Sequence, residues 1–260
     1  MPRFAANLTL MFNEVPLLER FEAAAQAGFR AVEVLFPYEA PPAAIAEALR
    51  RNDLTPALFN MAPGDYEAGE RGLACLPGRF SEFQHAVDTA LLYAHATGVR
   101  RFHLMAGKGD RNDPDAVAAY CKSVAYAAET LTREHIEILL EPINSRDMPG
   151  YFLNDFGFAE DLIHELALPN VKLQFDIYHR QIMHGDVTTA LRRLMPIIGH
   201  IQIASVPSRH EPDRGELNYP FLFDELDRLG YRGFVGCEYR PRKDTLDGLD
   251  WFLPYKGKLA

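Results

Sequence analysis

Eight short runs of β-branched, aromatic and other apolar residues recur along the chain, with longer segments between them. The runs occupy residues 3–8, 31–36, 55–60, 101–106, 136–141, 171–176, 200–205 and 234–239. Each run has the length of a buried strand, and the segments between them begin and end with residues that are typical of helix termini. Strands that alternate with helices pair in parallel, because each helix carries the chain back along the sheet. The pattern therefore predicts an α/β protein with a parallel sheet.

Eight such units favour a sheet that closes on itself. The competing architecture is an open, doubly wound sheet, which commonly carries a glycine-rich phosphate turn after its first strand. The turn here, LTLMFNE, contains no glycine. A length of 260 residues suits a single (β/α)8 TIM barrel, and no linker or shift in composition divides the chain. We therefore expect residues 1–260 to form one barrel domain, with functional residues at the carboxyl ends of its strands.

Prolines and short polar residues precede the helical segments, as is typical of helix starts. Pro41 with Pro42, and Asp113 with Pro114, open two of them. Four further residues are expected to cap helices, namely Asn13, Asn154, Asp186 and Asp244. The C-terminal stretch GLDWFLPY, which contains Trp251, is expected to pack on the barrel in a structural role.

The formal net charge is −9, and no run of Lys and Arg offsets it, which argues against nucleic acid as a partner. The N-terminal stretch MPRFAANLTLMFNEVP does not resemble a signal peptide, and no run reaches the roughly 18 apolar residues of a membrane span. Cys75, Cys121 and Cys237 lack the spacing of a zinc or redox motif. We expect a cytoplasmic protein with no membrane partner, and a homo-oligomer is one possible state.

Four oxygen-bearing side chains fall at the carboxyl ends of four consecutive predicted strands. They are Glu141, Asp176, Gln202 and Glu238. Each acid alone would also fit an ordinary ion pair, but three carboxylates at one end of a barrel repel one another unless a cation neutralises them. Carboxylate and amide oxygens suit a hard divalent ion, Mg²⁺ or Mn²⁺, whereas zinc favours His and Cys. The pattern predicts a metal site with these four ligands.

Further candidates lie on the loops that follow the strands. His179 stands three residues after Asp176 and is expected to begin a loop, while Arg209 lies in the long loop SVPSRHEPDRGELNY. Arg71 lies in another long loop, residues 61–79, and Lys108 follows the fourth strand. Such residues are either ordinary surface side chains or contacts to a small anionic substrate. We expect His179, Arg209, Lys108 and Arg71 to bind substrate.

A metal flanked by two glutamates is suited to moving a proton between adjacent carbons of a hydroxy-carbonyl compound. The cation stabilises the enediolate, while one carboxylate removes the proton and the other supports its return. This interpretation makes Glu141 and Glu238 the catalytic acid/base pair as well as metal ligands. It predicts a metal-dependent isomerase acting on a small oxo-hydroxy compound.

The motifs LLEPIN, QFDIYH, GHIQIA, RHEPDRGELNY and GCEYRP resemble those of the hydroxypyruvate isomerase family of xylose-isomerase-like barrels. The resemblance runs from Arg3 to about Tyr255. It implies that the strand-end Glu, Asp, Gln and Glu bind the metal and that the two glutamates transfer the proton. MPRFAANL and FNMAPGD are similar to the 2-oxo-tetronate isomerase branch, whereas LLEPIN and DIYH are similar to hydroxypyruvate isomerase itself. The substrate therefore stays open between these two acids.

Three alternatives remain at this point. A zinc-cluster apurinic-site endonuclease would need several strand-end histidines, where this chain offers Asn7, Glu33, Asn60 and Gln202. A ketose 3-epimerase resembles the site closely but usually carries His in the place of Gln202. A barrel that binds a ligand without catalysis is the third alternative.

Overall fold

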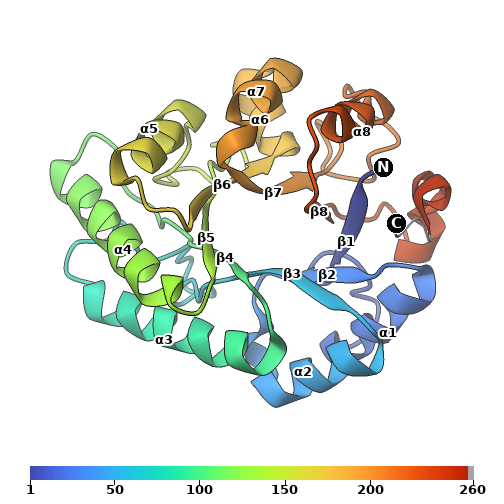
Figure 1. The fold of residues 1–260 in the computed structure, drawn as a ribbon, viewed down its shortest axis with the longest axis horizontal. Helices are drawn as coiled ribbons and strands as arrows, with labels where there is room; N and C mark the ends of the chain where they lie inside the picture. Colours follow the sequence, from blue (N-terminus) through green and yellow to red (C-terminus); the bar gives the residue numbers. More distant parts are fainter. Residues whose placement is uncertain (257–260) are drawn as a thin grey trace.

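The structure is a computed structural model, and it describes residues 1–256. Eight parallel strands close into a barrel in the order of the sequence, with the helices around it (Figure 1). This confirms the predicted (β/α)8 TIM barrel. The strands are β1 Arg3–Asn7, β2 Ala31–Val34, β3 Thr55–Asn60, β4 Arg101–His103, β5 Glu137–Leu140, β6 Val171–Asp176, β7 Ile198–Ile203 and β8 Phe234–Cys237.

The helices follow the strands, and β6 is followed by two of them. They are α1 Leu17–Ala27, α2 Pro42–Arg51, α3 Phe80–Thr97, α4 Pro114–Thr132, α5 Phe156–Leu166, α6 Ile177–His184, α7 Val187–Leu194 and α8 Tyr219–Arg228. Short 3₁₀ turns cover Pro37–Glu39, Met195–Ile197, Thr245–Gly248 and Asp250–Tyr255. The last of these packs Trp251 against Phe4 with 5.2 Å between ring centroids, so the expected packing of the C-terminal stretch is confirmed.

Two predicted helix caps are wrong. Asn13 lies four residues before α1, whose N-cap is Pro16. The N-cap of α5 is Asp155 rather than its neighbour Asn154, because the Asp155 side chain accepts a hydrogen bond from the Phe158 backbone N–H. Asp113 caps α4 through the Asp115 N–H, as the sequence indicates. These differences move helix starts without changing the order of the elements.

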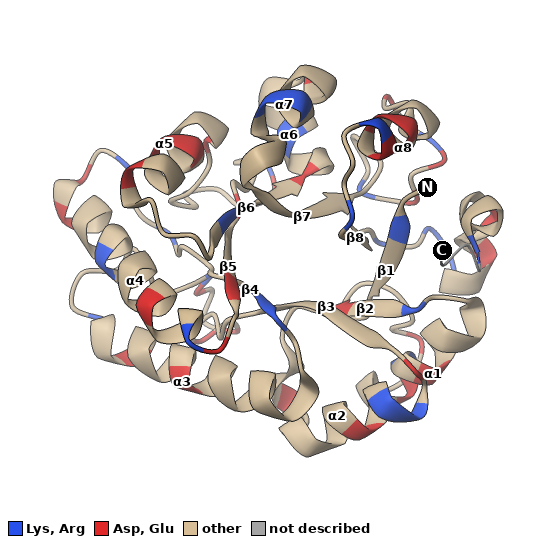
Figure 2. Cartoon of the chain, in the orientation of Figure 1, with Lys and Arg blue, Asp and Glu red and all other residues tan. Residues whose placement is uncertain are grey.

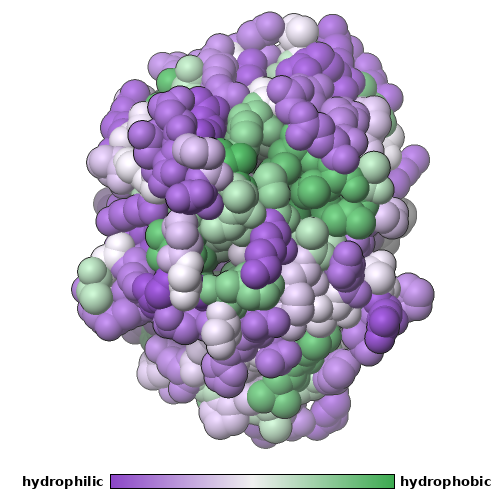
Figure 3. Space-filling view, turned by 90° about the vertical axis from the view of Figure 1, so that its left-hand side faces the viewer, coloured by the Kyte–Doolittle hydropathy of each residue, from purple (hydrophilic) through white to green (hydrophobic). Residues whose placement is uncertain are grey.

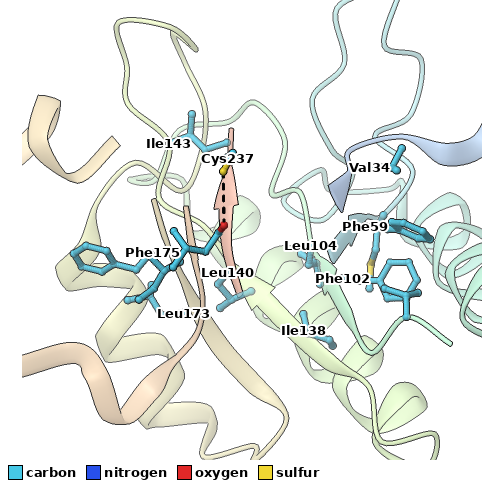
Figure 4. Close-up of a cluster of buried hydrophobic side chains, with 14 of the residues drawn as sticks. Val34, Phe59, Phe102, Leu104, Ile138, Leu140, Ile143, Leu173, Phe175 and Cys237 are labelled. Carbon is cyan, nitrogen blue, oxygen red and sulfur yellow. Dashed lines mark hydrogen bonds between the residues drawn. The ribbon is translucent and has the colours of Figure 1, made fainter. Parts of the chain in front are cut away.

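Alternate residues of each strand point outward and form the main core against the helices (Figure 4). Phe59, Phe102 and Phe175 are fully buried there. Removing such a side chain from water stabilises the fold by about 1.5–3 kcal/mol each. The large aromatic residues in the predicted strands therefore account for how the helix ring is held to the barrel.

The residues between these outward positions point into the barrel and are mostly small or polar, although Phe234 packs among them. Ala5, Ala31 and Ala57 form a small separate cluster near the amino ends of the first three strands. Toward the carboxyl ends the inward positions become polar, as with Asn7 and Glu33, both fully buried. The outward apolar residues thus attach the helices to the barrel. The inward polar residues lie toward the carboxyl ends of the strands, where the chemistry of such barrels occurs.

The outer surface carries charges of both signs along the helices and loops (Figure 2). On the side where α4 and α5 lie, hydrophobic side chains form patches among hydrophilic ones (Figure 3). No helix within residues 1–256 is long and apolar enough to span a membrane.

Candidate active site

The four predicted strand-end residues lie at one end of the barrel. Asp176 is the last residue of β6, Gln202 lies near the end of β7, and Glu141 and Glu238 directly follow β5 and β8. Asp176 pairs with Gln202 across the β6–β7 register. All four are buried, with Glu238 the most exposed at 7%. The register therefore brings Asp176 and Gln202 level with each other, and Glu141 and Glu238 follow the strands on either side of this pair.

Glu141, Asp176 and His179 form the tightest group. One donor atom from each lies within 4.8 Å of the others, a spacing that a single metal ion can bridge. The His179 Nε2 is 3.5 Å from Asp176 Oδ2 and 3.8 Å from Glu141 Oε1. The prediction that His179 begins a loop is wrong, because the loop is absent and His179 lies in the first turn of α6.

The tautomer of His179 indicates how its ring acts. The backbone N–H of Asn144 donates to Nδ1 at 3.3 Å, and the Asn144 side-chain nitrogen lies 2.7 Å from the same atom. Because Nδ1 accepts, the hydrogen of the neutral ring belongs on Nε2, which faces the carboxylates. Burial, and then the charge of Arg209, holds the pKa of His179 well below its usual range. The ring is therefore a neutral N–H donor aimed into the site.

The carboxylates of the site fit a cation. Glu141 Oε1 and Asp176 Oδ2 are buried and accept no hydrogen bond from any described residue, while Asp176 Oδ1 caps α6 through the Tyr178 N–H at 2.8 Å. Burial, and then the charges of Glu238 and Asp176, raises the pKa of Glu141 well above its usual range. Burial likewise raises the pKa of Asp176 to about 6 and that of Glu238 to about 8. Buried anionic oxygens without donors are what a hard metal ion satisfies.

Arg209 reaches into the same group of acids. Its Nη2 lies 2.9 Å from Glu238 Oε1 and 4.0 Å from Asp176 Oδ2, and its Nη1 lies 3.7 Å from Asp147. The Arg209 backbone is in the left-handed region at φ 55°, an uncommon conformation for a non-glycine residue. The long β7–α8 loop thus turns sharply to place a guanidinium beside the carboxylates, where Arg209 pairs with Glu238.

Two buried side chains fix the orientation of the Gln202 amide. Its Nε2 donates to Glu33 Oε2 at 3.0 Å, and its Oε1 accepts from Gln174 Nε2 at 2.6 Å. An amide oxygen has two lone pairs, so one is left for a metal ion. Gln202 therefore lies at the expected end of the barrel, and its amide is oriented by a buried polar layer that the sequence analysis did not connect with it.

A cavity of about 470 Å³ opens above these residues. Its walls include Arg71 and Tyr66 from the loop 61–79, and the Arg71 guanidinium stacks 3.7 Å from the centre of the Tyr66 ring. Lys108 is not among the lining residues, and its Nζ lies beside Gly69 instead, 3.9 Å from where a Cβ at Gly69 would stand. The structure thus brings Arg71 to the cavity and leaves Lys108 outside its lining.

The long loop 61–79 is fixed rather than loose. Gly72 forms an antiparallel bridge with Ala106 after β4, and the Cys75 N–H donates to Ala106 O at 2.8 Å. Arg79 bonds to Glu70 at 2.6 Å, so these two residues tie the loop to itself rather than meeting substrate. The loop is a wall of the cavity.

Two cavity residues were missed from the sequence. His103 ends β4, and its Nδ1 lies 3.2 Å from Glu141 Oε2, while burial lowers its pKa to about 3. Arg240 follows β8 by three residues and lines the cavity beside Glu238. The predicted strand ran to residue 106, so the strand-end rule that selected Glu141 did not point to His103, which ends the shorter observed strand.

A parallel barrel with a cavity lined by buried acids and histidines at the carboxyl ends of its strands defines a TIM-barrel enzyme. Residues 21–255 match the family model described as "Xylose isomerase-like TIM barrel". The chain belongs to this family.

Relatives of nearly equal length are similar in sequence. The "2-oxo-tetronate isomerase" of Cupriavidus necator is 54% identical, over 99% of this chain and 100% of that protein. The "Hydroxypyruvate isomerase" of Escherichia coli K12 is 43% identical, over 98% of this chain and 100% of that protein. A crystal structure of "AP endonuclease, family 2" from Brucella melitensis is 51% identical with a TM-score of 0.96, over 98% of this chain and 100% of that one. The curated relatives identify the chain as an isomerase.

Proposed function

We propose that the protein is a metal-dependent isomerase of small oxo-hydroxy acids, converting hydroxypyruvate to tartronate semialdehyde or 2-oxo-tetronate to 3-oxo-tetronate. The names of the near full-length relatives support this substrate class. The observation that carries the proposal is the pair of buried carboxylate oxygens without donors, Glu141 Oε1 and Asp176 Oδ2, in a cavity that also contains arginines.

Glu141, Asp176, Gln202 and Glu238 would hold Mg²⁺ or Mn²⁺, with the His179 N–H directed at a substrate oxygen. When bound, the ion supplies charge stabilisation for an enediolate. Its oxygen ligands come from three carboxylates and one amide, which is the donor set that hard divalent ions prefer. The His179 tautomer supports a contact to substrate rather than a fifth ligand.

Glu141 and Glu238 carry the proton in this proposal. One carboxylate takes the proton from the carbon that bears the hydroxyl, the electron pair forms the enediol, and the other returns a proton to the neighbouring carbon. The hydroxyl proton passes to the former carbonyl oxygen, so the atoms balance and no redox partner is needed. Burial raises the pKa of Glu238 to about 8 in the metal-free protein, and a bound cation would lower it and favour the carboxylate form that accepts a proton.

Arg71 and Arg240 give the cavity its preference for an acid. Both line it, and neither forms a salt bridge with a carboxylate within residues 1–256, whereas Arg209 is paired with Glu238. The Arg71 Nη1 donates to the backbone oxygens of Tyr66 and Glu70, which fixes the guanidinium and leaves its other donors available. A substrate carboxylate satisfies such unpaired cations, and a neutral ketose does not.

The free thiols Cys75 and Cys237 are buried, and none of the three cysteines forms a disulfide in the described chain. This supports the proposed cytoplasmic location, where thiols stay reduced.

A substrate panel tests the proposal. Protein stripped with EDTA is assayed on hydroxypyruvate, 2-oxo-tetronate, a ketohexose and an abasic-site duplex, with and without added Mg²⁺ or Mn²⁺. We expect metal-stimulated isomerisation of at least one acid and no cleavage of the duplex, which the net charge of −9 repels. Epimerisation of the ketose alone would favour the 3-epimerase alternative, and inactivity on both acids with metal present would overturn the assignment.

A further inference from the structure

A layer of polar side chains lies below the cavity inside the barrel. It comes from four different strands, and each member is 0–1% exposed. Its members are Asn7 of β1, Glu33 of β2, Gln174 of β6, and His200 and Gln202 of β7. Burying polar groups is unfavourable unless each finds a partner, so such a layer in place of apolar packing calls for a specific role.

Glu33 is the centre of this layer. Its Oε2 accepts from Gln202 Nε2 at 3.0 Å and from Asn7 Nδ2 at 3.2 Å, and its Oε1 is in hydrogen-bond contact with His200 Nε2. The three partners come from two strands, one on either side of the β8 position in the closed barrel. Toward the Asn7 and Gln202 amides Glu33 is the acceptor.

The barrel makes room for this carboxylate. Gly236 of β8 pairs with Gln202 of β7, and a Cβ at Gly236 would overlap the Glu33 carboxyl group. The glycine on one strand is thus matched to the acid on another strand. The match gives Glu33 its place at the centre of the barrel beside Gln202.

The acceptor character of Glu33 fixes the direction of the neighbouring hydrogen bonds. Because a carboxylate cannot donate, Gln202 turns its Nε2 toward Glu33 and its Oε1 away. That oxygen accepts from Gln174 Nε2 at 2.6 Å. A directed chain of hydrogen bonds therefore runs from Glu33 through Gln202 to Gln174.

We infer that Glu33 is a positioning residue for the metal site: by accepting from the Gln202 Nε2, it fixes which way the Gln202 amide faces and keeps the Gln202 oxygen turned away from Glu33. This rests on the proposed function, since Gln202 and Glu141 act there as ligands. Residues that orient metal ligands typically change metal affinity or activity by about 10–100-fold when altered.

The experiment measures Mn²⁺ binding by electron paramagnetic resonance of the free ion, together with kcat and KM on the acid that the wild type isomerises. Glu33→Gln keeps the size of the side chain but presents a donor, so the Gln202 amide can reverse. We expect Mn²⁺ to bind about 10–100-fold more weakly, with kcat lowered and KM for the acid changed less than about 3-fold. Circular dichroism and the melting temperature establish that the variant is folded.

Glu225→Gln is the matched control. Glu225 is also buried, at 3% exposure, but it pairs with Arg192 at 2.6 Å on the helix ring away from the cavity. The Mn²⁺ affinity of the Glu225→Gln protein is expected to equal that of the wild type. Glu33→Asp provides a second variant that keeps the charge and shortens the reach, and it is expected to weaken Mn²⁺ binding less than Glu33→Gln.

Wild-type Mn²⁺ affinity and kcat in folded Glu33→Gln or Glu33→Asp protein would overturn the inference and leave the proposed function standing. Failure of the wild type itself to bind Mn²⁺ would instead overturn the proposed function. If Glu33→Gln does not fold, the Glu33→Asp protein decides by the same two measurements.

Discussion

At the scale of single residues, the central feature is a set of carboxylates that are buried close together. In the protein without metal, the pKa values of Asp176 and Glu238 are raised to about 6 and about 8. Ordinary carboxyl groups titrate near pH 4 in an unfolded chain. These acids make the folded protein bind more protons than the unfolded chain, whereas the lowered pKa values of His103 and His179 act in the opposite direction below about pH 6.5. The stability is therefore expected to fall with rising pH mainly between about pH 7 and pH 8, where Glu238 titrates.

This gives a stability prediction for metal-free protein. We expect the free energy of unfolding to be lower at pH 8.5 than at pH 7 by on the order of 1 kcal/mol, since one pKa unit corresponds to about 1.4 kcal/mol. The melting temperature measured by calorimetry should fall by roughly 2–4 °C over that range. Saturating Mn²⁺ should reduce this loss of stability at high pH. In the metal-free protein, Glu238→Gln should remove part of the same loss. A metal-free melting temperature that is constant or rises with pH would contradict this account of the acids.

Arg71 provides a second prediction at the residue scale. Replacing it with Gln removes a cavity-lining cation that has no carboxylate partner in the described chain, so a substrate acid loses a charge-assisted hydrogen bond worth about 1.5–3 kcal/mol. We expect KM for the acid to rise by about 10–100-fold, with kcat lowered much less. Lys108→Ala is the control, because Lys108 lies outside the cavity lining. Equal effects of the two substitutions would indicate that Arg71 does not meet the substrate.

At the scale of elements, the strands were predictable and their inner contacts were not. The aromatic and β-branched runs locate all eight strands, and those at 55–60 and 171–176 have the predicted bounds. The strand-end rule places Glu141 and Asp176 because it depends only on position within one strand. The bond between Glu33 and Gln202 joins residues 169 positions apart, so no local pattern reveals it. His179 was misplaced because Asp176 caps a helix immediately after the strand.

The loop 61–79 yields a prediction at this scale. Gly72 has φ +121°, and a Cβ there would overlap the Met105 carbonyl oxygen, so Gly72→Ala should detach the loop from β4. We expect a loss of about 2–4 kcal/mol in unfolding free energy and a higher KM, since Arg71 adjoins Gly72. Gly78→Ala is the control, because Gly78 also has positive φ, +82°, but no atom lies within 4 Å of its added Cβ. It should show only the conformational cost, about 1–2 kcal/mol. The two are compared by denaturant titration, and similar losses would contradict the anchoring of the loop.

At the scale of the whole molecule, the barrel separates packing from chemistry. Its outward strand residues hold the helix ring, while the inward residues change from alanine to polar side chains toward the carboxyl ends. In the proposed function the chemistry rests on Glu141, Glu238 and the arginines without carboxylate partners. The sequence therefore predicted the fold and the first ring of acids better than the layer beneath them.

The central claim is metal-dependent proton transfer by Glu141 and Glu238. The most direct measurement follows hydroxypyruvate or 2-oxo-tetronate by proton NMR in D₂O with EDTA-stripped protein before and after Mg²⁺ is added, with Glu141→Gln and Glu238→Gln proteins in parallel. We predict that isomerisation begins when metal is added, that deuterium enters the product at the carbon that receives the returned proton, and that either variant is slowed by at least about 100-fold. Full conversion by the stripped protein, or by both variants with metal present, would contradict the claim.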